Sequence, residues 1–96
     1  MNTYIVLGNY TDKGVAAIKN SPKRRAGVRK LLKSLGGRMK DFYLVMGGPD
    51  LVIIAELPND KAAARFALTV ASAGFVRTTT LKAFPEKDYR EIIASI

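Results

Sequence analysis

Four stretches of the chain carry the apolar, β-branched and aromatic pattern that is typical of β-strands. They are residues 3–10, 38–46, 51–57 and 75–84. Turn-forming residues at 47–50 separate the second stretch from the third, which predicts a β-hairpin. The fourth stretch also holds the consecutive polar residues 77–80, which either face solvent on an edge strand or line a pocket.

Between these strands, apolar residues recur at the spacing of an α-helix. In the region 21–35 they occupy positions i, i+3, i+4 and i+7, namely Val28, Leu31, Leu32 and Leu35. Ser21 is the expected N-cap of this helix, with Pro22 at its preferred first position. Gly36 follows the last apolar residue and is expected to end the helix.

A second helix is predicted between residues 58–60 and Gly74. Its alanine content suggests a close approach to the sheet. The apolar face of this helix consists of Ala63, Phe66, Ala67 and Val70. Two shorter helical segments are expected at 13–20 and 85–96. The order is then strand, helix, strand, strand, helix, strand, followed by a terminal helix.

This order predicts a ferredoxin-like βαββαβ fold of the α+β class. We expect a four-stranded antiparallel sheet with two helices on one face, in a single domain that spans residues 1–96. The strands at 3–10, 38–46 and 51–57 are apolar on both faces, a pattern that indicates burial on both. Since the helices cover one face only, a second copy of the chain is expected over the other, as a homodimer or a higher oligomer. The alternative is that the segment 85–96 folds over the open face.

The chain contains no Cys, no His and no Trp. Disulfides, thiolate nucleophiles and histidine-based acid–base catalysis are therefore excluded. We expect no cofactor and no metal site, because a zinc site would need carboxylates alone. The longest apolar runs have five residues, so no membrane span is expected, and the absence of disulfides fits a cytoplasmic location.

The net charge of +8 lies in the first half of the chain. Residues 1–48 hold ten Lys and Arg against two acids, whereas residues 49–96 hold six of each. The helix at 21–35 is expected to present a basic patch opposite its apolar stripe, formed by Lys23, Arg25, Arg29, Lys30 and Lys33. Such a patch would attract phosphates and could bind nucleic acid, or it is simply a solvated helix face.

Several polar residues are candidates for ligand binding. Arg24 falls near the apolar stripe of its helix, where an arginine usually has an anionic partner, so we expect Asp50, Asp12 or a bound anion beside it. Alternation along the last strand places Arg77 and Thr79 on one face, either as a pocket lining or as solvent-exposed edge residues. The full set of ligand-binding candidates is Arg24, Asp50, Arg77, Thr79, Asn9 and Tyr10.

Four segments together resemble the GYD-domain family of small, mostly bacterial proteins. They are TYIVLGNYTDKG, NSPKR, LLKSLGGRMKDFYLVMGGPD and GFVRTTTLKAF. The tripeptide that names the family is here Gly48-Pro49-Asp50, and Pro in place of the aromatic residue alters the hairpin tip. The resemblance implies a ferredoxin-like fold of the dimeric α+β barrel type and leaves the chemistry open. The hairpin VMGGPDLVIIAEL is also similar to the module of Lrp/AsnC-type regulators that binds amino acids at subunit interfaces.

Three functions follow as hypotheses. The leading one is a small oligomeric module that binds a small molecule or a partner protein at or near a subunit interface. The second is a cofactor-independent enzyme of the dimeric α+β barrel type. Monooxygenases of that architecture use polar and aromatic groups in their cavity, and Asn9, Tyr4 and Tyr10 are such groups on the first strand. The third is nucleic-acid binding through the basic helix. The missing His and Trp favour a protein without catalytic activity.

Overall fold

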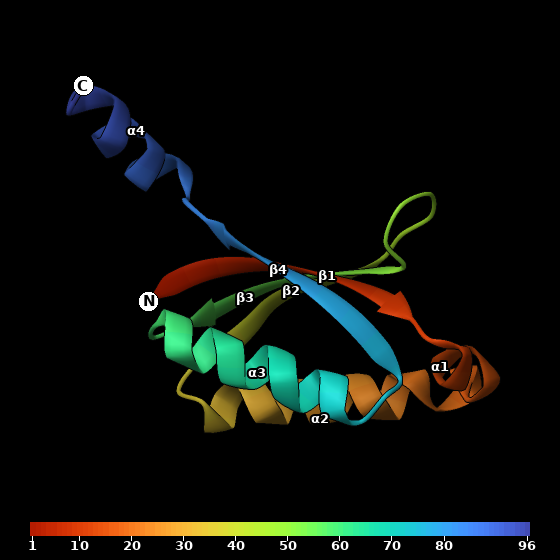
Figure 1. The fold of residues 1–96 in the computed structure, drawn as a ribbon. Coiled ribbons are helices and arrows are strands. Elements are labelled where there is room, and N and C mark those ends of the chain that lie inside the picture. Colours follow the sequence, from red (N-terminus) through yellow and green to blue (C-terminus); the bar gives the residue numbers. More distant parts are fainter.

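A computed structural model describes all residues, 1–96, and contains one antiparallel sheet with helices on one face (Figure 1). The strand order is β2-β3-β1-β4, which confirms the predicted ferredoxin-like arrangement. In chain order the elements are β1 (Asn2–Tyr10), α1 (Asp12–Ala16), the 3₁₀ turn η1 (Ile18–Asn20), α2 (Ser21–Ser34), β2 (Arg38–Leu44), β3 (Leu51–Leu57), α3 (Asp60–Ser72), β4 (Val76–Ala83) and α4 (Glu86–Ala94).

The end of α2 shows why the sequence stops the helix where it does. Gly36 adopts a left-handed backbone with φ of 84°. Its N–H donates to Lys33 O at 3.0 Å, and the N–H of Gly37 donates to Leu32 O at 2.9 Å. This pair of bonds is the Schellman motif, and it satisfies carbonyls that the helix end would otherwise leave free.

The start of α2 differs from the prediction. Asn20 occupies the N-cap position and Ser21 is already helical, with no side-chain cap on the helix. The Ser21 hydroxyl lies instead 2.8 Å from the Tyr10 hydroxyl at the end of β1. The predicted N-cap role of Ser21 is therefore wrong, because a tertiary hydrogen bond engages the hydroxyl that capping would need. Helix α3 follows the rule: Asn59 Oδ1 accepts from Ala62 N at 2.9 Å.

The core lies between the sheet and the helices α2 and α3. Alternate residues of β1 and β3 point toward the helices, so the buried side chains come from both layers. Its main cluster consists of Tyr4, Val6, Leu32, Met39, Ile53, Ala55, Leu57, Ala62, Ala63 and Phe66. None of the helices is long and apolar enough to cross a bilayer.

The paired part of the β2–β3 hairpin is shorter than the sequence predicts. Strand β2 ends at Leu44, not at Met46, and the Met46 side chain is 97% exposed. The Val45 N–H donates to Asp50 O, and Gly47 has φ of 112°. A left-handed glycine turns the chain out of the ladder, so the tip of the hairpin projects from the sheet as a loop (Figure 1).

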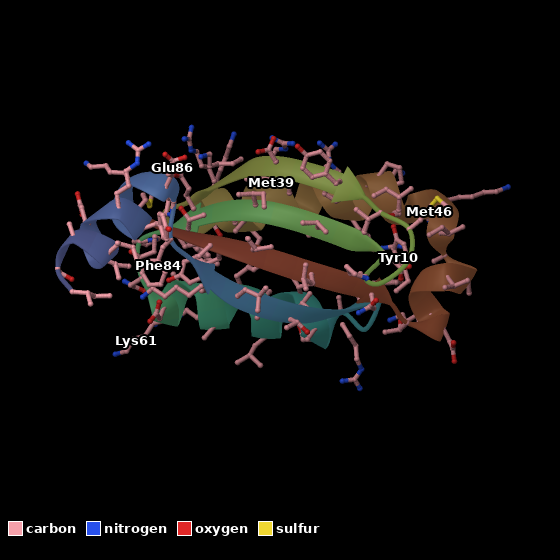
Figure 2. The ribbon with its side chains drawn as sticks, turned by 90° about the horizontal axis from the view of Figure 1, so that it is seen from above. Tyr10, Met39, Met46, Lys61, Phe84 and Glu86 are labelled. Atoms are coloured by element: carbon pink, nitrogen blue, oxygen red, sulfur yellow. The ribbon has the colours of Figure 1, made fainter.

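The face of the sheet opposite α2 and α3 is apolar at its centre and is not covered by the rest of the chain (Figure 2). The register pairs Ile5 with Ile54 and Leu7 with Val52 on this open face. Helix α4 leaves the end of β4 and points away from the sheet, so it does not fold over the open face (Figure 1). The alternative that residues 85–96 cover the open face is therefore wrong.

Candidate functional site

Helix α2 presents an exposed basic surface. Lys23, Arg29, Lys30 and Lys33 are all exposed, and the helix contains no acidic residue. The ion pairs of the molecule lie elsewhere, at Arg38–Glu56, Lys82–Asp60 and Arg90–Glu86. The four α2 cations therefore face solvent without an acidic partner, and we call these four residues the basic face.

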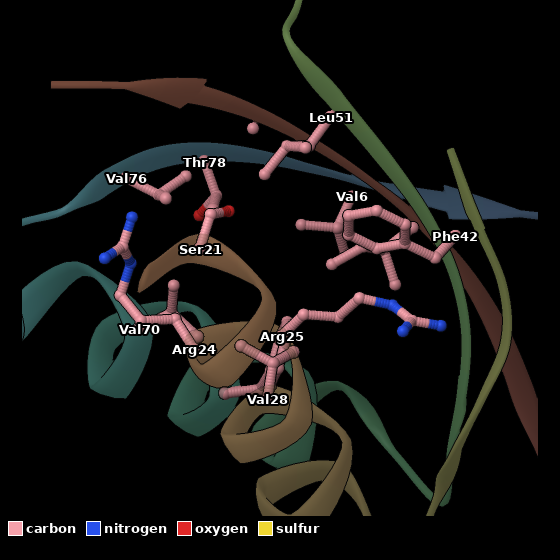
Figure 3. Close-up of a pocket in the computed structure, with 13 residues that line it drawn as sticks. Val6, Ser21, Arg24, Arg25, Val28, Phe42, Leu51, Val70, Val76 and Thr78 are labelled. Atoms are coloured by element: carbon pink, nitrogen blue, oxygen red, sulfur yellow. The ribbon is translucent and has the colours of Figure 1, made fainter. Parts of the chain in front are cut away.

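Arg25 does not belong to this face, contrary to the expectation from the sequence. Its guanidinium lies 4.9 Å from the centroid of the Phe42 ring, in a cation–π contact with β2. The cause is its position on the helix: the wheel places Arg25 beside the apolar stripe and not opposite it. Figure 3 shows Arg24 and Arg25 pointing in opposite directions from neighbouring positions of α2.

Arg24 lies at the edge of the core, as its place on the wheel predicts. Its guanidinium carbon is 4.4 Å from the Phe75 ring centroid, and Nη1 donates to Ala17 O at 3.0 Å. Nη2 is buried without a hydrogen-bond partner. Neither Asp50 nor Asp12 forms an ion pair with it, so the expected salt bridge is wrong. An aromatic face and a carbonyl oxygen stabilise this cation in place of a carboxylate.

A cavity lies beside Arg24, between α2, α3 and the sheet (Figure 3). Its walls are mainly apolar, with Val6, Val28 and Phe66 among them, and its volume is about 50 Å³. Pockets for organic ligands usually enclose roughly 300–1,000 Å³. This cavity is therefore too small for an organic ligand.

A larger, open groove of about 610 Å³ lies at the end of the sheet where β1 stops and α2 begins. The hydrogen-bonded hydroxyls of Tyr10 and Ser21 lie in it. Arg25 is the charged residue of its lining. The remaining walls are apolar and consist of Ile18, Pro22, Phe42, Leu44 and Leu51. We call this feature the end groove.

The carboxylate of Asp50 forms a hydrogen bond to the backbone of its own chain. Asp50 Oδ2 accepts a hydrogen bond from Tyr10 N at 2.9 Å, and the Asp50 N–H donates to Gly8 O at 2.9 Å. These two bonds join the base of the hairpin to the end of β1. Asp50 therefore supports the position of Tyr10 and does not point at Arg24.

The remaining predicted ligand residues lie on the other side of the sheet. Asn9 pairs with Arg77, and Leu7 pairs with Thr79, between β1 and β4. These positions alternate with the core-facing ones, so their side chains belong to the open face. The structure thus brings Asn9, Arg77 and Thr79 together on one face and separates them from Tyr10 and Arg24 on the other.

Most of the chain matches one known family. The family model of the GYD domain aligns with residues 4–93. This chain belongs to the GYD domain family. A relative from Thermus thermophilus is 37% identical over 89 residues, which cover 92% of this chain and 94% of that protein. It is named "Glutamine synthetase and cystathionine beta-lyase binding protein".

A crystal structure of a protein from Thermus thermophilus shares the fold of this GYD domain. It is similar with a TM-score of 0.57 and 24% sequence identity, over 88% of this chain and 95% of that one. At this identity the likeness bears on the fold alone.

One polar cluster of the GYD domain was not predicted from the sequence. The buried Tyr4 hydroxyl donates to Asp60 Oδ1 at 2.6 Å, and Lys82 Nζ lies 3.1 Å from the same oxygen. Burial raises the pKa of the Tyr4 phenol, and the hydrogen bond from Tyr4, helped by Lys82, lowers the pKa of Asp60. Tyr4 and Lys82 are cross-strand neighbours, but only the fold brings Asp60 between them. The cluster fixes the start of α3 to the sheet.

A second carboxyl with a lowered pKa, that of Glu56, lies on the open face. A hydrogen bond from Arg38, its cross-strand partner on β2, lowers the pKa of the Glu56 carboxyl. The carboxylates of the chain are dispersed, and no three of them lie close enough to share a metal ion.

Proposed function

We propose that this GYD domain is a homodimeric module that binds a partner protein, and that the partner is a metabolic enzyme with an acidic surface. The observation that carries the proposal is the basic face: four exposed cations on one helix, none of them in an ion pair. Unpaired surface charges of one sign steer a partner of the opposite sign and select against others. The name of the Thermus relative supports an enzyme as the partner.

The arrangement of aromatic residues favours a protein over a nucleic acid. Single-stranded nucleic acids are bound on aromatic platforms beside a basic groove. The exposed aromatic residues here are Tyr43, Phe84 and Tyr89, and all three lie outside α2. The basic face therefore offers positive charge without aromatic rings on which nucleic-acid bases could stack. Such a surface suits an acidic protein partner.

The open face of the sheet supports the dimer. Its centre consists of the paired residues Ile5, Ile54, Leu7 and Val52, which no other element covers. Packing this face against a second sheet would remove the apolar area from water and place the basic faces of two copies on opposite outer surfaces. The chain has no cysteine to form disulfides, and we place it in the cytoplasm with its partner.

Binding to purified enzymes tests this proposal. Glutamine synthetase and cystathionine β-lyase from the same cells are the first probes, because the relative is named for binding them. The GYD protein is immobilised, and each enzyme is passed over it at about 50 and about 300 mM salt. Because salt screens the attraction between opposite charges, the affinity should be at least tenfold lower at the higher concentration. A duplex and a single-stranded DNA probe are measured in parallel.

A charge-reversal variant separates a specific surface from general basicity. Lys23→Glu, Arg29→Glu and Lys30→Glu combined should abolish enzyme binding, whereas Lys61→Glu with Arg65→Glu on the exposed side of α3 should not. Both sets change exposed positions, so both proteins should fold. Binding of neither enzyme, or binding of the DNA probes alone, would overturn the proposal, as would equal loss in the two variants.

A further inference from the structure

Helix α4 exposes an apolar stripe that the rest of the chain does not cover. Within the helix its residues are Tyr89, Ile92 and Ile93, at the spacing i, i+3 and i+4, and Ile96 follows two residues after the helix ends. Their exposed fractions are 57%, 42%, 51% and 96%. An isolated helix shorter than roughly 12–15 residues is marginal in water, and α4 has nine. It therefore needs a packing surface in order to persist, and its own sheet does not supply one.

The end groove is a surface of matching character. Its lining is apolar, and two of its residues are well exposed: Leu44 at 70% and Ile18 at 44%. It lies at the opposite end of the sheet from α4 (Figure 1), so a chain cannot place its own α4 there. An apolar helical stripe laid into an apolar groove is a recurrent mode of recognition.

The charges of the two surfaces are complementary. Arg25 lies in the end groove, and α2 carries six cations and no acid. Helix α4 has three acids and two cations. Arg90 is paired with Glu86, which leaves Asp88 and Glu91 without an ion pair, and Asp88 lies nearer the border of the apolar stripe. Docking would bring Asp88 toward the basic start of α2.

The geometry of a sheet-to-sheet dimer explains how α4 of one copy comes near the end groove of the other. Helix α4 and the β2–β3 hairpin both project on the open side of the sheet, at opposite ends (Figure 1). When a twofold axis lies between two such sheets and runs across the strands, each end of one sheet faces the opposite end of the other. In that arrangement α4 of each copy arrives at the hairpin end of the other copy. The end groove lies on the α2 side of that end, so α4 passes around the end of the sheet to reach it.

We propose that the end groove receives α4 of a second copy, so that the two chains exchange their C-terminal helices across the dimer. The inference rests on the proposed homodimer and adds a specific contact to it. Ile92 and Ile93 fill the groove beside Leu44, and Asp88 faces the cations of α2. The dimer is then joined at three places: at the centre by the open faces and at both ends by α4.

Disulfide cross-linking tests this contact, because the chain has no cysteine of its own. Protein with Leu44→Cys is mixed with ¹⁵N-labelled protein carrying Ile92→Cys, and Ile18→Cys is mixed with labelled Ile96→Cys. After mild oxidation, mass spectrometry should find covalent dimers with one labelled and one unlabelled chain. The matched control is Leu68→Cys, an exposed apolar position on the outside of α3, which should not cross-link to Ile92→Cys.

Each outcome decides between the arrangements. Mixed-label dimers from either pair support the exchange. Ile92→Cys that cross-links mainly to itself would mean that the two α4 helices meet each other, and the inference would be wrong. Absence of mixed dimers while light scattering shows a dimer overturns the exchange alone, whereas a monomer by light scattering overturns the proposed dimer as well. As a second readout, Ile92→Asp with Ile93→Asp should weaken dimerisation at least tenfold without lowering the melting temperature of the monomer.

Discussion

The Asp50 carboxylate accepts a hydrogen bond from the Tyr10 backbone N–H at 2.9 Å. The two residues are far apart in sequence, at the base of the hairpin and at the end of β1. Asp50 is the acid of the tripeptide Gly48-Pro49-Asp50, which resembles the motif that names the family. The bond joins the Asp50 side chain to the Tyr10 backbone and does not involve the ring of Pro49.

Removing this carboxylate should loosen the hairpin. Asp50→Ala is expected to cost about 1–2 kcal/mol of unfolding free energy, because it leaves the Tyr10 N–H without its charged acceptor. Asp50→Asn keeps an acceptor oxygen and should cost about half as much. Urea unfolding measures the loss, and amide hydrogen exchange should accelerate at Tyr10. Asp41→Ala, at an exposed position of β2, is the control, and an equal effect there would contradict the assignment.

The burial of the Tyr4 phenol, together with its hydrogen bond to Asp60, predicts a loss of stability at alkaline pH. The folded state raises the pKa of the Tyr4 phenol above its usual value of about 10, so the folded form holds its proton longer than the unfolded form. Its contribution is complete below pH 10 and is lost as the pH rises through the folded pKa, by up to about 1.4 kcal/mol per pH unit.

Tyr4→Phe tests this dependence. It should cost about 1 kcal/mol at pH 7 for the lost hydrogen bond and should flatten the fall in stability above pH 10. The measurement is the urea midpoint between pH 7 and 11. A profile for Tyr4→Phe that runs parallel to the parent protein would rule out this origin.

The secondary structure could be predicted because it depends on local patterns. The stripe from Val28 to Leu35 and the left-handed turn at Gly36 are properties of neighbouring residues. Capping by Ser21 failed as a prediction because the competing hydroxyl of Tyr10 is brought to it by the fold. The same reason explains Arg24, whose place at the core edge follows from the helix wheel while its partner, Phe75, comes from a distant loop.

The candidate site could have been predicted further than it was. Asn9 and Tyr10 are adjacent in one strand, so alternation alone places them on opposite faces. Asn9 and Tyr10 therefore cannot line the same face of the predicted strand. The helix wheel likewise puts Arg25 beside the apolar stripe, near Phe42. The Tyr4–Asp60 contact, in contrast, needs the docking of α3 on the sheet, which no periodicity describes.

Two glycines within helices should respond to alanine in opposite directions. Gly27 in α2 has open space where a Cβ would stand, whereas a Cβ at Gly14 in α1 would overlap the carbonyl oxygen of Phe75. Gly27→Ala should therefore stabilise the protein by about 0.5–1 kcal/mol through helix propensity. Gly14→Ala should destabilise it by about 1–3 kcal/mol through overpacking. Thermal unfolding measures both, and a stabilising Gly14→Ala would contradict the close contact between α1 and the loop before β4.

A charge at the centre of the open face should separate the subunits without unfolding them. Ile54 lies opposite Ile5 on the face that the helices leave uncovered, so Ile54→Asp changes no contact with the helices. In the proposed dimer the new carboxylate would be buried without a partner, at a cost of about 3 kcal/mol or more, which corresponds to a roughly 100-fold weaker dimer. Sedimentation of parent and variant over a concentration series measures this shift. Leu68→Asp, on the outer side of α3, should leave the association unchanged. A variant that stays dimeric at the parent's dissociation constant would show that the open face is not the interface, and the exchange of α4 would then need a different dimer geometry.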